Sequence, residues 1–166
     1  LTIMGSMKLS TKEIETWTKA RELFKTFHGT KALELYQSLA KKYPLHPHLL
    51  FEMASAAKLS GDVPLARASF RKALRHGQNE ARLLLPLGRE FRSLRMSREA
   101  RECFQRVVQL ESKSIPGIAE MVRWYESEGN IDGAQQLLDP ILAVEPNAPL
   151  ARHLQAFLLH RRSEFS

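Results

Sequence analysis

The same kinds of residue recur along this chain every 34 positions, and this period constrains the fold more than any other feature. Four alanines stand at that spacing: Ala32, Ala66, Ala100 and Ala134. A large apolar or aromatic residue follows each alanine: Tyr36, Phe70, Phe104 and Leu138. A small or medium-sized residue precedes each alanine: Ala20, Ala54, Gly88 and Val122. Such a period is typical of helical hairpins that stack on one another.

Spacing within one period predicts two helices. One apolar face follows the helical i, i+3, i+4, i+7 rule, with Leu50, Met53, Ala54 and Ala57. A second face begins at Ala66, and between the two lies Gly61, which favours the left-handed conformation that ends a helix. Pro64 suits the first turn of the second helix. One hairpin cannot bury its apolar face alone, so stacked copies are expected.

These columns resemble the tetratricopeptide repeat family, whose motif W-x2-L-G-x2-Y…A-x3-F…P is matched at most positions. The first tryptophan of the motif is replaced in every copy, by Thr16, Leu50, Leu84 and Ile118. The resemblance implies an all-α fold, a right-handed α-solenoid of antiparallel helical hairpins.

The period predicts four repeats, at residues 13–46, 47–80, 81–114 and 115–148, which together form one domain. Residues 1–6 are interpreted as a vector-derived remnant before Met7. Residues 149–163 are either a capping helix or half of a fifth repeat in a protein that continues past Ser163. The second alternative predicts self-association through this half repeat.

The resemblance also implies that the first helix of each repeat lines a concave groove. The candidate groove residues are mostly cationic, with a few large apolar ones: Trp17, Arg21, Lys25, Phe51, Lys58, Arg82, Leu85, Arg89, Arg92 and Arg123. With a net charge of +7, such a groove suits an acidic peptide with apolar anchors. The alternative is that these cations only solvate helix faces. Arg89 and Arg92 lie outside the core columns, so their replacement is expected to leave the fold intact.

Some members of the family grip a C-terminal carboxylate with cations and amides at set groove positions. Two of the corresponding residues here do not suit that clamp. Glu52 would repel a carboxylate, and Pro86 donates no hydrogen bond. Pro86 is also unusual for a helix, and we favour a helix that begins near Leu83 with Pro86 in its first turn.

No residue pattern predicts catalysis, a metal site or a cofactor. Cys103 lies beside the core column and is interpreted as a packing residue. His46 and His48 lack acidic or thiol ligands nearby in the sequence. The chain has no apolar run of ~18 residues, so no membrane span is expected.

The sequence therefore favours a non-catalytic protein–protein interaction module or scaffold, in the cytoplasm because its single cysteine fits a reducing compartment. One alternative is the N-terminal region of a longer enzyme, such as a sulfotransferase-like transferase. Nucleic-acid binding is a third and less favoured possibility, because the aromatic residues do not form a stacking series.

Overall fold

The computed structural model describes residues 8–164, and their regular secondary structure is entirely α-helical. The helices within this range are α1 (Thr11–Lys25), α2 (Gly29–Lys42), α3 (Pro47–Leu59), α4 (Val63–His76), α5 (Ala81–Ser93), α6 (Ser97–Leu110), α7 (Ile115–Ser127), α8 (Ile131–Val144) and α9 (Pro149–Glu164). The predicted all-α fold of helical hairpins is confirmed. The predicted remnant at residues 1–6 lies outside the described residues.

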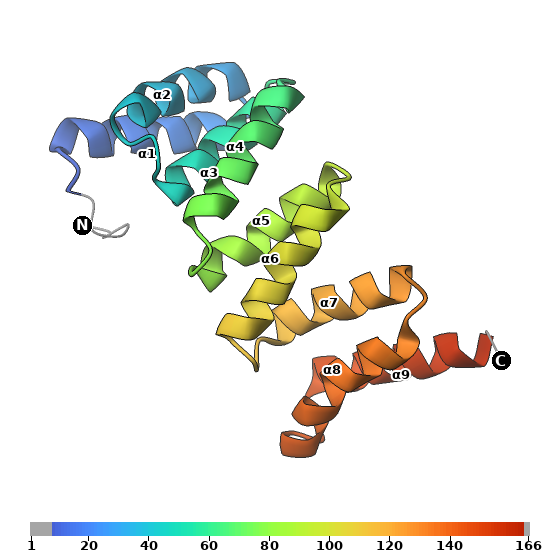
Figure 1. The fold of residues 1–166 in the computed structure, drawn as a ribbon. Helices are drawn as coiled ribbons and strands as arrows, with labels where there is room; N and C mark the ends of the chain where they lie inside the picture. The colour runs from blue at the N-terminus through green and yellow to red at the C-terminus, as the bar shows by residue number, and fades with distance from the viewer. Residues whose placement is uncertain (1–7, 165–166) are drawn as a thin grey trace. The chain divides into compact units, whose positions relative to one another are not determined.

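The helices form two compact units, one ending at Gln78 and the other beginning at Asn79. Figure 1 shows α1–α4 of the first unit in blue to green and α5–α9 of the second in yellow-green to red. The repeat period predicts one domain, but in a repeat array each repeat packs on its neighbours, so no single central core is required. The right-handed superhelix over all repeats stays a prediction.

Within each unit, successive helices pack on one another. In the first unit α1 contacts α2, α2 contacts α3, and α3 contacts α4. In the second unit α5 contacts α6, α6 contacts α7, α7 contacts α8, and α9 contacts both α7 and α8.

The predicted core columns are buried. The alanines of the 34-residue column are at most 4% exposed, and the large residues that follow them at most 2%. A Cβ atom added to Gly88 would lie 2.5 Å from the ring of Phe104. That distance is shorter than any normal contact, so the close approach of α5 and α6 depends on the glycine.

The break inside each hairpin holds one residue with positive φ, and these residues recur every 34 positions. They are Phe27, Gly61, Arg95 and Gly129, with φ of 61°, 90°, 59° and 72°. In all four breaks the next backbone N–H donates to the carbonyl five residues earlier, at 2.8–2.9 Å. The predicted helix-ending role of Gly61 is confirmed. Phe27 and Arg95 adopt the same conformation without the freedom of glycine, which strains the backbone.

Prolines mark several helix starts, but Pro86 does not. Pro47 and Pro64 lie in the first turns of α3 and α4, as predicted for Pro64. The prediction for Pro86 is wrong, because α5 begins at Ala81 and holds this proline in its interior. The carbonyl of Glu80 accepts the N–H groups of residues 83 and 84, at 2.9 and 3.0 Å, and so starts the helix earlier than expected.

Candidate functional site: an arginine cluster around Glu120

Glu120 is a buried carboxylate that the sequence analysis did not single out. It lies in the middle of α7, on a segment where Ala119, Met121 and Val122 are also buried. Its side chain is only 1% exposed. A carboxylate in such a position must be paired, because removing an isolated charge from water costs far more than a folded domain can offset.

Three arginines provide that pairing, and we call them with Glu120 the arginine cluster. Arg89 of α5 donates from Nε to Oε1 at 2.9 Å, and Arg92 of α5 donates from Nη1 to Oε2. Arg123 of α7 places Nη1 3.3 Å from Oε2. Burial alone would raise the pKa of Glu120, but the hydrogen bonds from the two α5 arginines outweigh it and hold the pKa below its ordinary value.

The arginine cluster carries more positive than negative charge. Over residues 8–164, Glu120 is the acidic partner of each of the three arginines, so three positive charges face one negative charge. The side chains of Arg89, Arg92 and Arg123 are 52%, 49% and 56% exposed. An excess of two positive charges is therefore presented to solvent, on guanidinium groups that a buried carboxylate orients.

The first unit contains a related pair without this excess. Glu52 of α3 accepts from Nε and Nη2 of Arg21 in α1, at 3.0 and 2.6 Å, and from Nε1 of Trp17 at 2.6 Å. Arg21 and Glu52 are 31 residues apart, as are Arg89 and Glu120. The hydrogen bond to Glu52 raises the pKa of Arg21, and this ion pair matches one positive charge with one negative charge.

Of the three large apolar residues predicted to contact a peptide, Phe51 and Leu85 are partly exposed, whereas Trp17 is buried. Trp17 is only 3% exposed, and its indole is fixed by the hydrogen bond to Glu52, so its prediction as a groove anchor is corrected to a core role. Phe51 is half-buried, with its ring centroid 5.6 Å from that of Phe70. Leu85 is half-buried in the second unit.

The remaining predicted cations do not pair with Glu120. Lys25 is exposed and pairs with Glu22 of its own helix at 3.1 Å. Lys58 is half-buried near the end of α3, and Arg82 is exposed in the first turn of α5. Of the predicted groove residues, the structure brings Arg89, Arg92 and Arg123 together. A single groove over all repeats stays a prediction.

The structure argues against the expectation that Arg89 and Arg92 can be replaced without harm to the fold. Both neutralise the buried Glu120, and reversing their charges would place three carboxylates together. The signal that could have revealed this is the recurrence of an arginine and a glutamate in the same two columns, at Arg21 and Glu52 and again two repeats later.

Other chemically interesting residues have structural roles. Cys103 is fully buried, and burial raises the pKa of its thiol, with further contributions from Glu102 and Glu99. The side chain of His46 caps α3, where its Nδ1 accepts the N–H of Leu49 at 3.2 Å. Within residues 8–164, no group of three or more potential metal ligands is found. None of the helices described here is long and apolar enough to cross a membrane.

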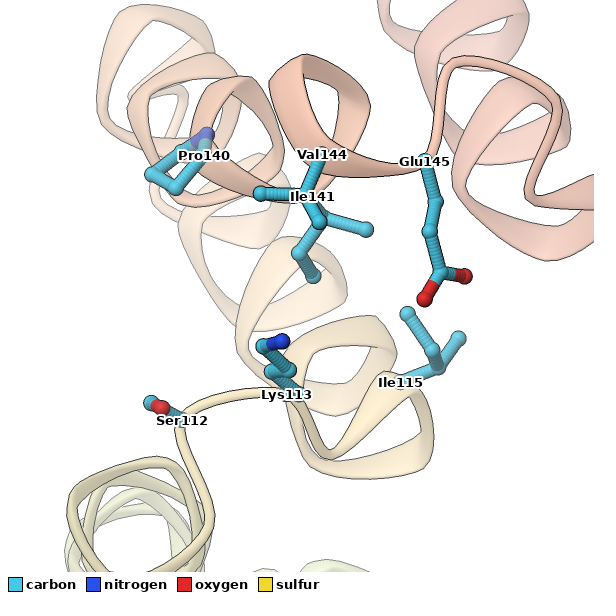
Figure 2. A pocket seen from close by; sticks show the side chains of 7 residues that line it. All are labelled: Ser112, Lys113, Ile115, Pro140, Ile141, Val144 and Glu145. Atoms are coloured by element: carbon cyan, nitrogen blue, oxygen red, sulfur yellow. The ribbon is translucent and has the colours of Figure 1, made fainter.

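A hollow of about 240 Å³ lies between the loop that follows α6 and the C-terminal end of α8 (Figure 2). Its lining is mainly apolar, with one hydroxyl, one cation and one acid: Ile115, Pro140, Ile141, Val144, Ser112, Lys113 and Glu145. The hollow is smaller than most small-molecule sites, which begin at about 300 Å³. None of these residues belongs to the arginine cluster.

Comparison with known proteins agrees with the repeat structure. Residues 18–81 match the family model described as tetratricopeptide repeat. Comparison with curated proteins gives no match to this sequence.

Solved structures with the same fold include several repeat proteins. The crystal structure of MamA protein has a TM-score of 0.71 at 15% identity, over 91% of this chain and 82% of that chain. A putative kinesin light chain from Podosopora anserina, with nearly identical TPR-like repeats, has a TM-score of 0.71 at 17% identity, over 95% of this chain and 90% of the other. The APC/C hetero-tetramer Cut9-Hcn1 has a TM-score of 0.61 at 21% identity, over 89% of this chain but 30% of that chain. At these identities the likeness is one of fold.

Proposed function

We propose, from the match of residues 18–81 to the tetratricopeptide repeat family model, that this chain binds an acidic peptide segment of a protein partner through the face of the second unit that carries the arginine cluster. The family fold itself suggests a protein–protein interaction scaffold. The finer proposal concerns which surface is used and which chemistry it recognises.

The observation that carries the proposal is the uncompensated charge of the arginine cluster. The ion pair between Arg21 and Glu52 is neutral, whereas Arg89, Arg92 and Arg123 share one carboxylate. Half-exposed guanidinium groups retain donors for a ligand, because each has five N–H groups. Such a surface attracts anionic partners and speeds their association.

Several features favour a peptide over a nucleic acid as the partner. Sequence-tolerant binding to single strands needs exposed aromatic faces on which bases stack. Trp17 is buried, and Trp124 is half-buried, with the guanidinium of Arg101 4.4 Å from its ring centroid. The indole of Trp17 therefore offers no stacking face, and that of Trp124 is already in contact with a guanidinium group.

The proposal is tested by selecting peptides from a random display library on the full chain. We expect the selected peptides to be enriched in Asp and Glu, with apolar residues beside them, and their binding to weaken as salt is added. The double variant Arg82→Glu/Arg123→Gln should reduce this binding, and the glutamine adds no second carboxylate beside Glu120. It avoids Arg89 and Arg92, whose hydrogen bonds hold Glu120.

The matched control is Lys31→Glu/Arg75→Gln, which makes the same change in net charge at exposed positions of the first unit. Selected peptides without an acidic bias would contradict the proposal. So would equal losses of binding in the test and control variants, because whole-chain charge would then explain the attraction.

A further inference from the structure

The arginine cluster contains more positive charge and more hydrogen-bond donors than one carboxylate ligand uses. Glu120 accepts one hydrogen bond from Arg89 and one from Arg92, and these involve one N–H of each guanidinium. Arg123 contributes its charge from 3.3 Å. Most N–H groups of the three side chains therefore remain for solvent or a ligand.

The charge balance distinguishes between classes of anionic ligand. A carboxylate side chain brings one negative charge and two acceptor oxygens. A phosphate monoester brings about −1.5 to −2 charges and three acceptor oxygens at neutral pH. Three guanidinium groups facing one glutamate leave two positive charges, which a phosphate monoester neutralises and a single carboxylate does not.

The cluster is also held in place before any ligand arrives. The side chain of Glu120 is 1% exposed, so its carboxylate is held in the packed interior. Its ion pairs with Arg89 and Arg92 orient both guanidinium groups. The guanidinium of Arg92 also lies over the ring of Phe104, at 5.9 Å from the centroid. A guanidinium that is already positioned loses less entropy when it binds an oxyanion.

We propose that Arg89, Arg92 and Arg123 form a phosphoryl-binding subsite that recognises a phosphorylated side chain of the partner peptide, with Glu120 as a positioning residue. This proposal rests on the proposed function, since the phosphoryl group is carried by the peptide that the second unit binds. Binding would consequently be switched on by phosphorylation of the partner.

The test uses three degenerate peptide libraries that differ only at a fixed central residue, which is serine, glutamate or phosphoserine. Each library is incubated with the full chain at physiological salt, and the retained peptides are quantified. We expect the phosphoserine library to be retained about tenfold more than the serine library, which corresponds to ~1.4 kcal/mol. The glutamate library should fall between them, because its charge and acceptor count are lower.

Three variants locate the effect. Arg123→Gln should lower affinity for a selected phosphopeptide about tenfold, because it removes a charge-assisted contact. It leaves the hydrogen bonds of Arg89 and Arg92 to Glu120 intact, and an unchanged helical spectrum would verify the fold. Arg123→Lys keeps the charge but removes the planar fork, so an intermediate loss is expected. Arg75→Gln, which removes one charge from α4, is the control and should have little effect.

The outcomes separate this inference from the proposed function. Equal retention of the phosphoserine and glutamate libraries would overturn the phosphoryl subsite while leaving acidic peptide binding in place. Unchanged phosphopeptide affinity in Arg123→Gln would also overturn it. Retention of none of the libraries would instead contradict the proposed function itself.

Discussion

Replacing Glu120 by glutamine should destabilise the second unit by about 1.5–3 kcal/mol. Hydrogen bonds that involve a charged group contribute about 1.5–3 kcal/mol each, and Glu120 accepts one from Arg89 and one from Arg92. Glutamine preserves part of this bonding, and the half-exposed arginines regain hydration, so roughly half of the gross contribution is lost. The expected cost is lower than that of breaking a fully buried pair, which is about 3–5 kcal/mol.

The experiment can be confined to one unit, because each unit contains one tryptophan. In a Trp17→Phe background, the fluorescence of Trp124 follows the unfolding of the second unit in urea. The matched comparison is Glu52→Gln, followed through Trp17 in a Trp124→Phe background. Its cost should fall in a similar range, because Glu52 is 21% exposed but accepts hydrogen bonds from both Trp17 and Arg21.

Salt provides a second readout of the same prediction. Glu120→Gln leaves three guanidinium groups close together, so added salt should recover part of the lost stability by screening their repulsion. Glu52→Gln leaves one guanidinium and should recover less. An unchanged or increased stability of Glu120→Gln at low salt would refute the reasoning. In that case the cost of burying the carboxylate would exceed what the arginines return.

Three further predictions concern an ion pair, the breaks inside the hairpins and a helix interface. Glu13→Gln should make the free energy of unfolding less sensitive to acidic pH, because the hydrogen bond from Lys42 is the largest cause that lowers the pKa of Glu13 to about 2. The stabilisation from Glu13 is present above pH ~4.5 and is lost as the pH falls toward 2, which acid titration followed by circular dichroism measures. Arg95→Gly should raise the free energy of unfolding, measured in urea, by up to about 1 kcal/mol, because glycine adopts a positive φ without strain. Gly129→Ala should lower the same free energy by about 1 kcal/mol. Gly88→Val should cost about 1–3 kcal/mol in thermal or urea unfolding by overpacking the interface of α5 and α6.

The repeat columns predicted the hairpins because they record packing directly. Positions such as Ala66 and Phe70 face a neighbouring helix in every copy, so the same size is required each time. The prediction failed at Pro86 because it followed the preference of proline for a first turn instead of the period, which places a helix start at residue 81, 34 residues after the start of α3. A backbone carbonyl at Glu80 begins α5 without a capping side chain, and such a cap leaves no residue signature.

The candidate site was only partly predictable, because a charge pattern does not reveal which charges are paired. Arg21 and Arg89 occupy the same column and look alike in the sequence. In the structure one is neutralised by Glu52, while the other shares Glu120 with two more arginines. Trp17 was misassigned for a related reason, since its place beside the groove column did not reveal that its indole is buried.

The origin of the excess charge can be traced to one position of the repeat. In two cases an arginine of one first helix pairs with a glutamate 31 residues later, in the first helix of the next copy. Arg123 stands in this arginine column, but the position 31 residues later holds Leu154, which is buried in the core formed by α7, α8 and α9. With no carboxylate available there, Arg123 instead approaches Glu120, three residues earlier in its own helix. In the last repeat a hydrophobic residue thus stands where an acidic partner of Arg123 would be. The positive charge of Arg123 adds to that of the arginine cluster, which makes the cluster suited to an anionic ligand.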